Sequence, residues 1–209
     1  PWNLRKVLKT KETWLIGIGW GLAMLAASGI MALLVPTLAA YGHDPVSIVA
    51  LLASMWPLGL LGHYLIGVID QKIGTKKTTV LVVVLQAVDF LIVAAFGDNY
   101  AICAIAIGLL MFAISGNANV CMSMTTSVFG RADFEIAWTP IQVIYNICNF
   151  SGVTVIALIS AIFGPFAVMI GAALICTIAL VFIGVCSDRQ IGSHIGFPGV
   201  ESQKEADRV

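Results

Sequence analysis

Residues 62–77 read Gly-His-Tyr-Leu-Ile-Gly-Val-Ile-Asp-Gln-Lys-Ile-Gly-Thr-Lys-Lys. The stretch is largely apolar as far as Ile69, then carries one aspartate and three lysines, and leads directly into another apolar run. A loop this short and this charged, between two segments of membrane length, is typical of a tight hairpin at a membrane surface. Its three lysines predict that this surface is the cytoplasmic one.

The composition is that of a membrane protein. Of 209 residues, 59% are hydrophobic and only 11% are charged, whereas soluble proteins carry charge on about a quarter of their residues. The formal net charge is zero, so nucleic acid is not expected as a partner. The five cysteines lie in apolar runs without a Cys-x-x-Cys pair, which predicts buried thiols rather than disulfides or a metal site. No cofactor is expected.

Counting outward from the loop predicts six segments long enough to cross a hydrocarbon core of roughly 30 Å. Because lipid offers the backbone no hydrogen-bond partners, these segments should be helices, and the protein an all-α integral membrane protein. Residues 1–13 are predicted to be a cytoplasmic linker, and residues 187–209 a mobile cytoplasmic tail. The predicted spans are 14–40, 46–69, 78–96, 101–129, 138–163 and 165–186.

The positions of the 11 lysines and arginines agree with this count. Four precede the first span, three lie in the loop at 70–77, one is Arg131, and three lie in the tail, whereas the alternate connections have none. This pattern predicts that both termini are cytoplasmic, with the plasma (inner) membrane as the expected location. The chain begins with Pro1 rather than methionine, and we expect it to be part of a longer polypeptide.

The loop also resembles a family motif. Its pattern Gly67-x-x-Asp70-x-Lys72-x-Gly74-x-Lys76-Lys77 is similar to Gly-x-x-x-Asp-Arg/Lys-x-Gly-Arg/Lys-Arg/Lys, the cytoplasmic-loop motif of the major facilitator superfamily. It departs from the motif in two ways, because the first glycine is one residue closer to the aspartate and Gln71 displaces the following basic residue.

The resemblance implies that the six spans are helices seven to twelve of a twelve-helix bundle, with the loop between helices eight and nine. An N-terminal six-helix half would then be the partner of this chain. Residues 129–134 resemble the connection between helices ten and eleven in the branch of oxalate/formate antiporters and monocarboxylate transporters. This implies a secondary transporter, a symporter or antiporter, of a small organic solute such as a carboxylate.

Two interpretations of the loop remain open. In both, we expect Gly67 to let two helices approach, Asp70 to cap the following helix, and the lysines to stay in water. In the first, the loop is only a positively charged anchor and tight turn. In the second, it is a conformational gate whose contacts differ between inward- and outward-facing states, an idea that comes from the resemblance.

His63 is a candidate for binding solute and for proton coupling. By resemblance it stands where the oxalate and monocarboxylate branch has an arginine in an Arg-Pro-x-x-Gly setting. Histidine titrates near neutral pH and can meet a carboxylate when it is charged. The alternative is a hydrogen-bonded packing residue. The fifth span lacks the basic residue that this branch uses for dianions, which counts against oxalate.

Amides and a phenol form a second group of candidates. Trp138, Gln142, Tyr145 and Asn149 recur on one helical stripe, with Asn146 beside it. We expect this stripe to line a solute pathway, although hydrogen bonding between helices is the alternative. Asn117 and Asn119, on either side of Ala118, either point at the same cavity or only allow close packing of neighbouring helices.

Asp89 is the only acidic residue inside the predicted spans. Holding an ionised aspartate at the centre of a membrane costs about 2.5–3.5 kcal/mol on insertion scales. We therefore expect Asp89 to face protein, to be protonated, or to bind a proton or cation. By resemblance it lies on helix nine, an outer scaffold helix.

The function predicted is alternating-access transport. A complete six-helix transporter working as a homodimer, and a non-catalytic membrane assembly protein, are the alternatives. An intramembrane enzyme is not expected, because the chain has no Gly-x-Ser-Gly element with a partner histidine, no paired intramembrane aspartates and no His-Glu-x-x-His helix.

Overall fold

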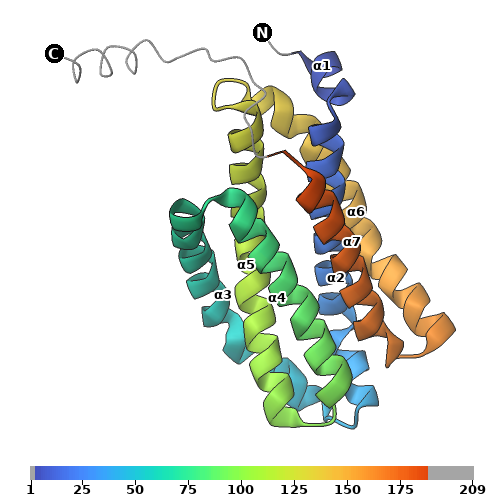
Figure 1. Ribbon diagram of the computed structural model, residues 1–209. Helices are drawn as coiled ribbons and strands as arrows, with labels where there is room; N and C mark the ends of the chain where they lie inside the picture. Colours follow the sequence, from blue (N-terminus) through green and yellow to red (C-terminus); the bar gives the residue numbers. More distant parts are fainter. Residues whose placement is uncertain (1–2, 188–209) are drawn as a thin grey trace.

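The computed structural model describes residues 3–187. These residues form seven helices without a strand (Figure 1), of which all but the first are long and apolar enough to cross a membrane. The helices are α1 (Leu4–Lys9), α2 (Lys11–Ala40), α3 (Pro45–Ile73), α4 (Thr75–Phe96), α5 (Tyr100–Phe129), α6 (Phe134–Phe163) and α7 (Ala167–Val185).

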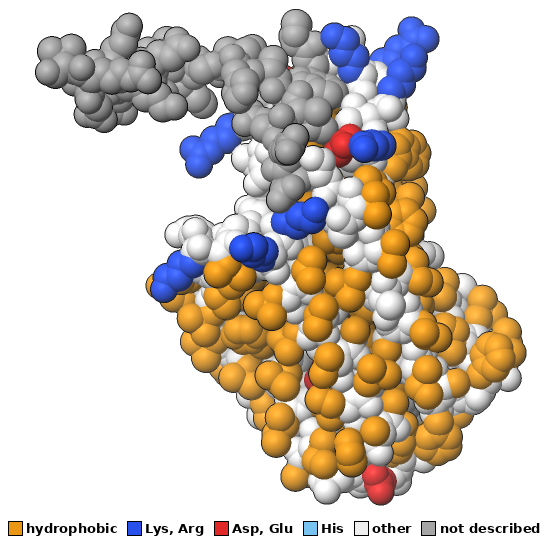
Figure 2. All heavy atoms as spheres, in the orientation of Figure 1, with side chains coloured by type: hydrophobic (Ala, Val, Ile, Leu, Met, Phe, Trp, Pro, Cys, Tyr) orange, Lys and Arg blue, Asp and Glu red, His pale blue; other side chains and the backbone are white. Residues whose placement is uncertain are grey.

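Lysine and arginine side chains are clustered on the surface, as they are in the sequence. Figure 2 shows lysine and arginine side chains gathered at one end of the molecule, above a body covered by hydrophobic side chains. This is the end where α1 and the connection between α5 and α6 lie (Figure 1). The predicted fold class is confirmed: the chain is an all-α integral membrane protein with six membrane-length helices.

The helices overlap the predicted spans and mostly begin a few residues earlier. The stretch predicted as a linker holds α1, whose first turn is capped by Asn3 through a hydrogen bond from the Lys6 N–H of 2.9 Å. Lys11, Glu12 and Thr13 already belong to α2. The predicted tail, apart from Ser187, lies outside the described residues.

Two expectations for the loop were wrong. The N-cap of α4 is Gly74, in the left-handed region at φ 88°, and no side chain caps this helix. Asp70 instead turns its carboxylate toward α5. Gly67 does not mediate a close approach between the described helices either, because a Cβ added there would meet no atom of residues 3–187 within 4 Å.

The opposite end of α3 is capped through a side chain. Asp44 accepts a hydrogen bond from the Ser47 N–H at 2.9 Å and another from the Ser47 hydroxyl at 2.9 Å. These bonds lower the pKa of the Asp44 carboxyl. The cap is therefore present at neutral pH and is lost only as the pH falls through that lowered pKa.

The parallel helices α2 and α6 contact each other along a row of small residues. A Cβ added at Gly17 would lie 3.0 Å from Ile144 Cβ, and one at Gly21 would lie 2.7 Å from Cys148 Cβ. At Gly29 an added Cβ would lie 2.6 Å from the carbonyl oxygen of Gly152. The two backbones can approach this closely only because side chains are missing at these positions.

A second parallel pair, α3 and α5, uses the same device. A Cβ at Gly62 would lie 2.7 Å from Phe112 Cα, and one at Gly59 would lie 2.8 Å from the Ser115 hydroxyl. On α5, Gly116 makes room for the side chain of Ile66. This pair places the polar face of α5 directly beside α3.

We expect Gly29→Ala to destabilise the protein by about 1–3 kcal/mol, because the new methyl group meets backbone that cannot move aside cheaply. Gly184→Ala is the matched control: it also lies inside a helix, but an added Cβ there meets no atom of the described residues within 4 Å. It should be neutral or slightly stabilising. The measurement is the thermal unfolding midpoint in detergent. Equal midpoints for the two variants would contradict the proposed close contact.

Candidate functional site

The candidate site is built on a row of polar residues along α5. Ser115, Asn119, Ser123 and Ser127 follow one another at intervals of four, so they lie on one face of the helix. We call these four residues the α5 polar row. All four take part in hydrogen bonds to α3 or to the first residue of α4.

His63 is held by the α5 polar row through both ring nitrogens. Its Nδ1 lies 2.7 Å from the carbonyl oxygen of Ser115, and its Nε2 lies 3.1 Å from the amide nitrogen of Asn119. The Ser115 carbonyl can only accept, so Nδ1 carries a proton. Asn119 then donates to an unprotonated Nε2, which describes a neutral imidazole.

A second proton on His63 would require the side-chain amide of Asn119 to flip. The protonated ring has two donors and no acceptor, so the amide oxygen of Asn119 would have to replace its nitrogen opposite Nε2. His63 is exposed at the surface of the described chain. The His63–Asn119 pair, predicted as two separate candidates, is one unit in the structure.

Further along the α5 polar row, the loop is tied to α5. The Ser123 hydroxyl donates to the Asp70 carboxylate at 2.6 Å and lies 3.0 Å from the Thr75 hydroxyl. Ser123 and Thr75 were not predicted. The four-residue spacing of Ser115, Asn119, Ser123 and Ser127 is the signal that could have identified Ser123.

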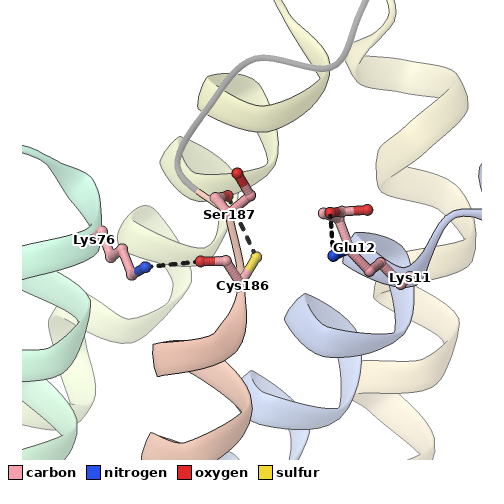
Figure 3. A network of polar contacts seen from close by, with 5 residues as sticks. All are labelled: Lys11, Glu12, Lys76, Cys186 and Ser187. Atoms are coloured by element: carbon pink, nitrogen blue, oxygen red, sulfur yellow. Dashed lines mark hydrogen bonds and ion pairs between the residues drawn. The ribbon is translucent and has the colours of Figure 1, made fainter.

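Lys76 leaves the loop in the other direction, toward α7. Its ammonium group donates to the carbonyl oxygen of Cys186 at 2.8 Å (Figure 3). Cys186 directly follows α7, where carbonyls lack helical partners, so a cation is favourable there. The expectation that the lysines stay in water is wrong for Lys76, whereas Lys72 and Lys77 are exposed.

The predicted stripe on α6 faces partly outward. Gln142 is exposed, and Tyr145, Asn146 and Asn149 are half-buried, as is Trp138. The Asn149 backbone carbonyl accepts a hydrogen bond from Ser28 of α2 at 2.9 Å. Within residues 3–187 no hydrogen bond joins this stripe to His63 or Asn119.

Asn117 and Asn119 point in different directions. Residues two apart on a helix lie on nearly opposite sides. Asn117 is buried and its amide nitrogen lies 3.2 Å from the sulfur of Met24 on α2, whereas Asn119 meets His63 on α3. The hypothesis that both asparagines point at the same cavity is wrong.

The predicted acid on α4 is separate from these groups. Asp89 is 2% exposed and Gln86, one turn earlier, is fully buried. Among the described residues, none of the side-chain oxygens or nitrogens of this pair has a hydrogen-bond partner. The pair lies on the helix that packs between α5 and α7.

Hollows on the surface do not coincide with most predicted residues. A cavity of about 250 Å³ lies at the loop and is lined by Gly74, Lys76 and Lys77 among others. Two larger apolar grooves, of about 380 and 530 Å³, contain none of the predicted solute-binding residues.

The end without lysines is closed by hydrogen bonds that were not predicted. His43 Nε2 lies 2.6 Å from the carbonyl oxygen of Gly97, and the Tyr41 hydroxyl donates to Ala94 at 3.4 Å. Burial raises the pKa of Tyr41. These contacts hold the turn after α2 against the end of α4.

Comparison with known proteins supports the fold. No protein-family model and no curated protein matches the chain. The crystal structure of an auto-inhibited POT family peptide transporter is similar at a TM-score of 0.71 and 15% identity, covering 90% of this chain and 39% of the transporter. The POT family transporter PepTSo gives a TM-score of 0.68 and 16% identity, covering 87% of this chain and 38% of the transporter.

At these identities the likeness shows the fold alone: the helices of this chain are arranged as in the matched parts of these two transporters. The chain spans less than two fifths of the length of either transporter. The predicted closer resemblance to oxalate/formate antiporters and monocarboxylate transporters is not supported, because both neighbours belong to the POT family.

We expect Lys76→Met to loosen the end of α7. A charge-assisted hydrogen bond of about 1.5 kcal/mol is lost, which raises the population of locally opened molecules roughly tenfold. The measurement is the rate of maleimide labelling of Cys186, which is buried, read peptide by peptide with mass spectrometry. Lys77→Met is the control, because Lys77 is exposed. Equal rates in both variants would show that the contact does not hold α7.

Proposed function

We propose that this chain is one half of a secondary active transporter that moves a small organic solute across the plasma (inner) membrane by alternating access. The other half would be a six-helix bundle packed against α3 and α6. Large apolar side chains on these two helices support this proposal: Trp56, Leu60 and Tyr64 on α3, and Ile147 and Phe150 on α6, are all more than three-fifths exposed.

The observation that carries the proposal is the state of His63. A histidine is held at both nitrogens by a neighbouring helix and still lies at the molecular surface, on the same helix as those exposed residues. A neutral ring offers no charge, whereas a protonated ring can bind a carboxylate. His63 and Asn119 would thus contribute to solute binding and couple it to a proton.

A peptide is the solute class that we propose first. The two structural neighbours are described as peptide transporters of the POT family. The predicted solute-binding residues of this chain include amides and a phenol, which can form hydrogen bonds with the N–H and C=O groups of a peptide backbone. They are Asn119, Gln142, Tyr145, Asn146 and Asn149. A peptide also carries a terminal carboxylate, for which protonated His63 is the partner in this chain.

The loop would act as the gate. Asp70 is tied to α5 and Lys76 to α7, each by one side-chain hydrogen bond. Gly74, the one residue between α3 and α4, has open space beside it, so it would let the connection between the two helices change shape. Motion of α3 and α4 relative to α5 and α7 would break these two bonds together.

We expect His63→Gln to keep peptide uptake but to flatten its pH dependence across the neutral range. Glutamine can replace both hydrogen bonds of the ring but cannot titrate in that range. His63→Ala should lose uptake as well, because the bonds to Ser115 and Asn119 disappear. The measurement is the initial rate of labelled-peptide uptake into proteoliposomes as a function of pH. An unchanged profile in His63→Gln would remove His63 from coupling.

A homodimer of six-helix chains is the second candidate for the same exposed faces. The mass of the native protein separates the two, detected with an antibody against residues 201–209. We expect a band near twice 22.2 kDa, which would correspond to a chain carrying a further six-helix half. A band near 22.2 kDa would contradict this proposal and favour the homodimer, which cross-linking would then detect.

A further inference from the structure

The Gln86–Asp89 pair is buried on α4 with no polar partner in the described structure. The two side chains are one turn apart on the same face, 0% and 2% exposed. Both carboxylate oxygens of Asp89 and both amide atoms of Gln86 are without a hydrogen bond. The hydrogen-bonding groups of this pair are therefore available for a ligand small enough to fit inside the bundle.

We propose that the Gln86–Asp89 pair is a proton-binding site and that Asp89 is a neutral carboxylic acid in this conformation. An ionised carboxylate has only acceptors and needs donors or a cation around it. A protonated one has a donor and an acceptor, and is tolerated in an apolar setting. A buried water can complete its hydrogen bonds where space allows.

The two helices that pack most extensively against α4 offer no cationic group to hold the ionised form. Neither α5 nor α7, the helices packed most extensively against α4, contains a lysine, arginine or histidine. The helix α3 also contacts α4, but its His63 is bonded to Ser115 and Asn119 of α5 and its Lys72 is exposed. The nearest lysine of α4 itself, Lys77, lies twelve residues away, about 18 Å along the helix. The bundle thus offers Asp89 no counter-charge from its own helix or from these two neighbours.

The titratable groups around Asp89 also disfavour a negative charge. The thiol of Cys103 on α5 is within electrostatic reach of Asp89 and of Asp98, which follows α4. On α7 the titratable group is Cys176, a fully buried thiol. Neither a thiol nor a second carboxylate stabilises an ionised Asp89.

A metal cation fits the pair less well than a proton does. The pair supplies three oxygens, two from Asp89 and one from Gln86, whereas Ca²⁺ takes six to eight oxygen ligands. No group of three or more histidine, cysteine, aspartate or glutamate residues gathers to hold a metal within residues 3–187. The proton is therefore the ligand that matches the available atoms.

The site is distinct from the solute-facing residues. His63 and the α6 stripe lie on α3 and α6, whereas Asp89 lies where α4 packs against α5 and α7. Release of its proton would leave a charge inside that packing, which favours a conformation that lets water reach α4. This link to transport rests on the proposed function, but the proton site itself does not.

Infrared spectroscopy of the folded protein tests the proposal directly. At neutral pH we expect the carbonyl stretch of a protonated carboxyl group, shifted in heavy water, and lost in Asp89→Asn. Asp98→Asn is the matched control, because Asp98 is exposed and should not contribute to this band. Absence of the band from the unaltered protein at neutral pH, or its persistence in Asp89→Asn, would overturn the proposal.

A second measurement needs no variant. A hydrophobic fluorescent carbodiimide reacts with protonated carboxyl groups, and peptide mapping shows where it attaches. We expect on the order of tenfold more labelling of Asp89 than of Asp98, since an ordinary aspartate is almost fully ionised at neutral pH. Labelling should fall at alkaline pH and be unaffected by sodium. Protection by sodium would instead indicate a cation site. Both measurements remain valid for a protein that transports no peptide.

Discussion

Close contact between parallel helices is the constraint on which the rest of this structure depends. In lipid, apolar side chains gain little by leaving their surroundings, so helices associate through packing at short range. The rows of small residues between α2 and α6, and between α3 and α5, allow that short range. The second row also sets the distance at which His63 can reach Ser115 and Asn119. The positions of these hydrogen-bonding groups thus depend on glycines at the contact between the two helices.

The sequence predicted the helices well because membrane length and charge are simple signals. The spans and the sign of each connection could be read from apolar runs and from the positions of lysine and arginine. Capping could not be predicted as reliably. Asp70 has a residue type suited to capping α4, but it lies inside α3 and accepts a hydrogen bond from Ser123 of α5 instead. Such a choice depends on a neighbouring helix fifty residues away.

The candidate site was predicted in its components but not in its grouping. His63 and Asn119 stood out because polar residues in apolar spans are few, and the structure joins them. Asn117 stood out for the same reason, yet it faces α2, because two residues of separation on a helix reverse the direction of a side chain. Gln86 was missed beside Asp89, although its spacing of three residues places both on one face. Residue type indicated which side chains could form hydrogen bonds or titrate. Only the three-dimensional packing showed which of these side chains contact one another.

The pairing of α2 with α6 has a consequence for biosynthesis. Among the membrane-length helices described, α2 is synthesised first, and three helices, α3 to α5, intervene before its glycine-lined face meets α6. Until then this face is covered by lipid or by a temporary neighbour. Only one helix, α4, is synthesised between α3 and α5. Assembly should therefore proceed from the α3–α5 unit outward, and a chain interrupted before α6 should leave α2 as the segment most open to quality control.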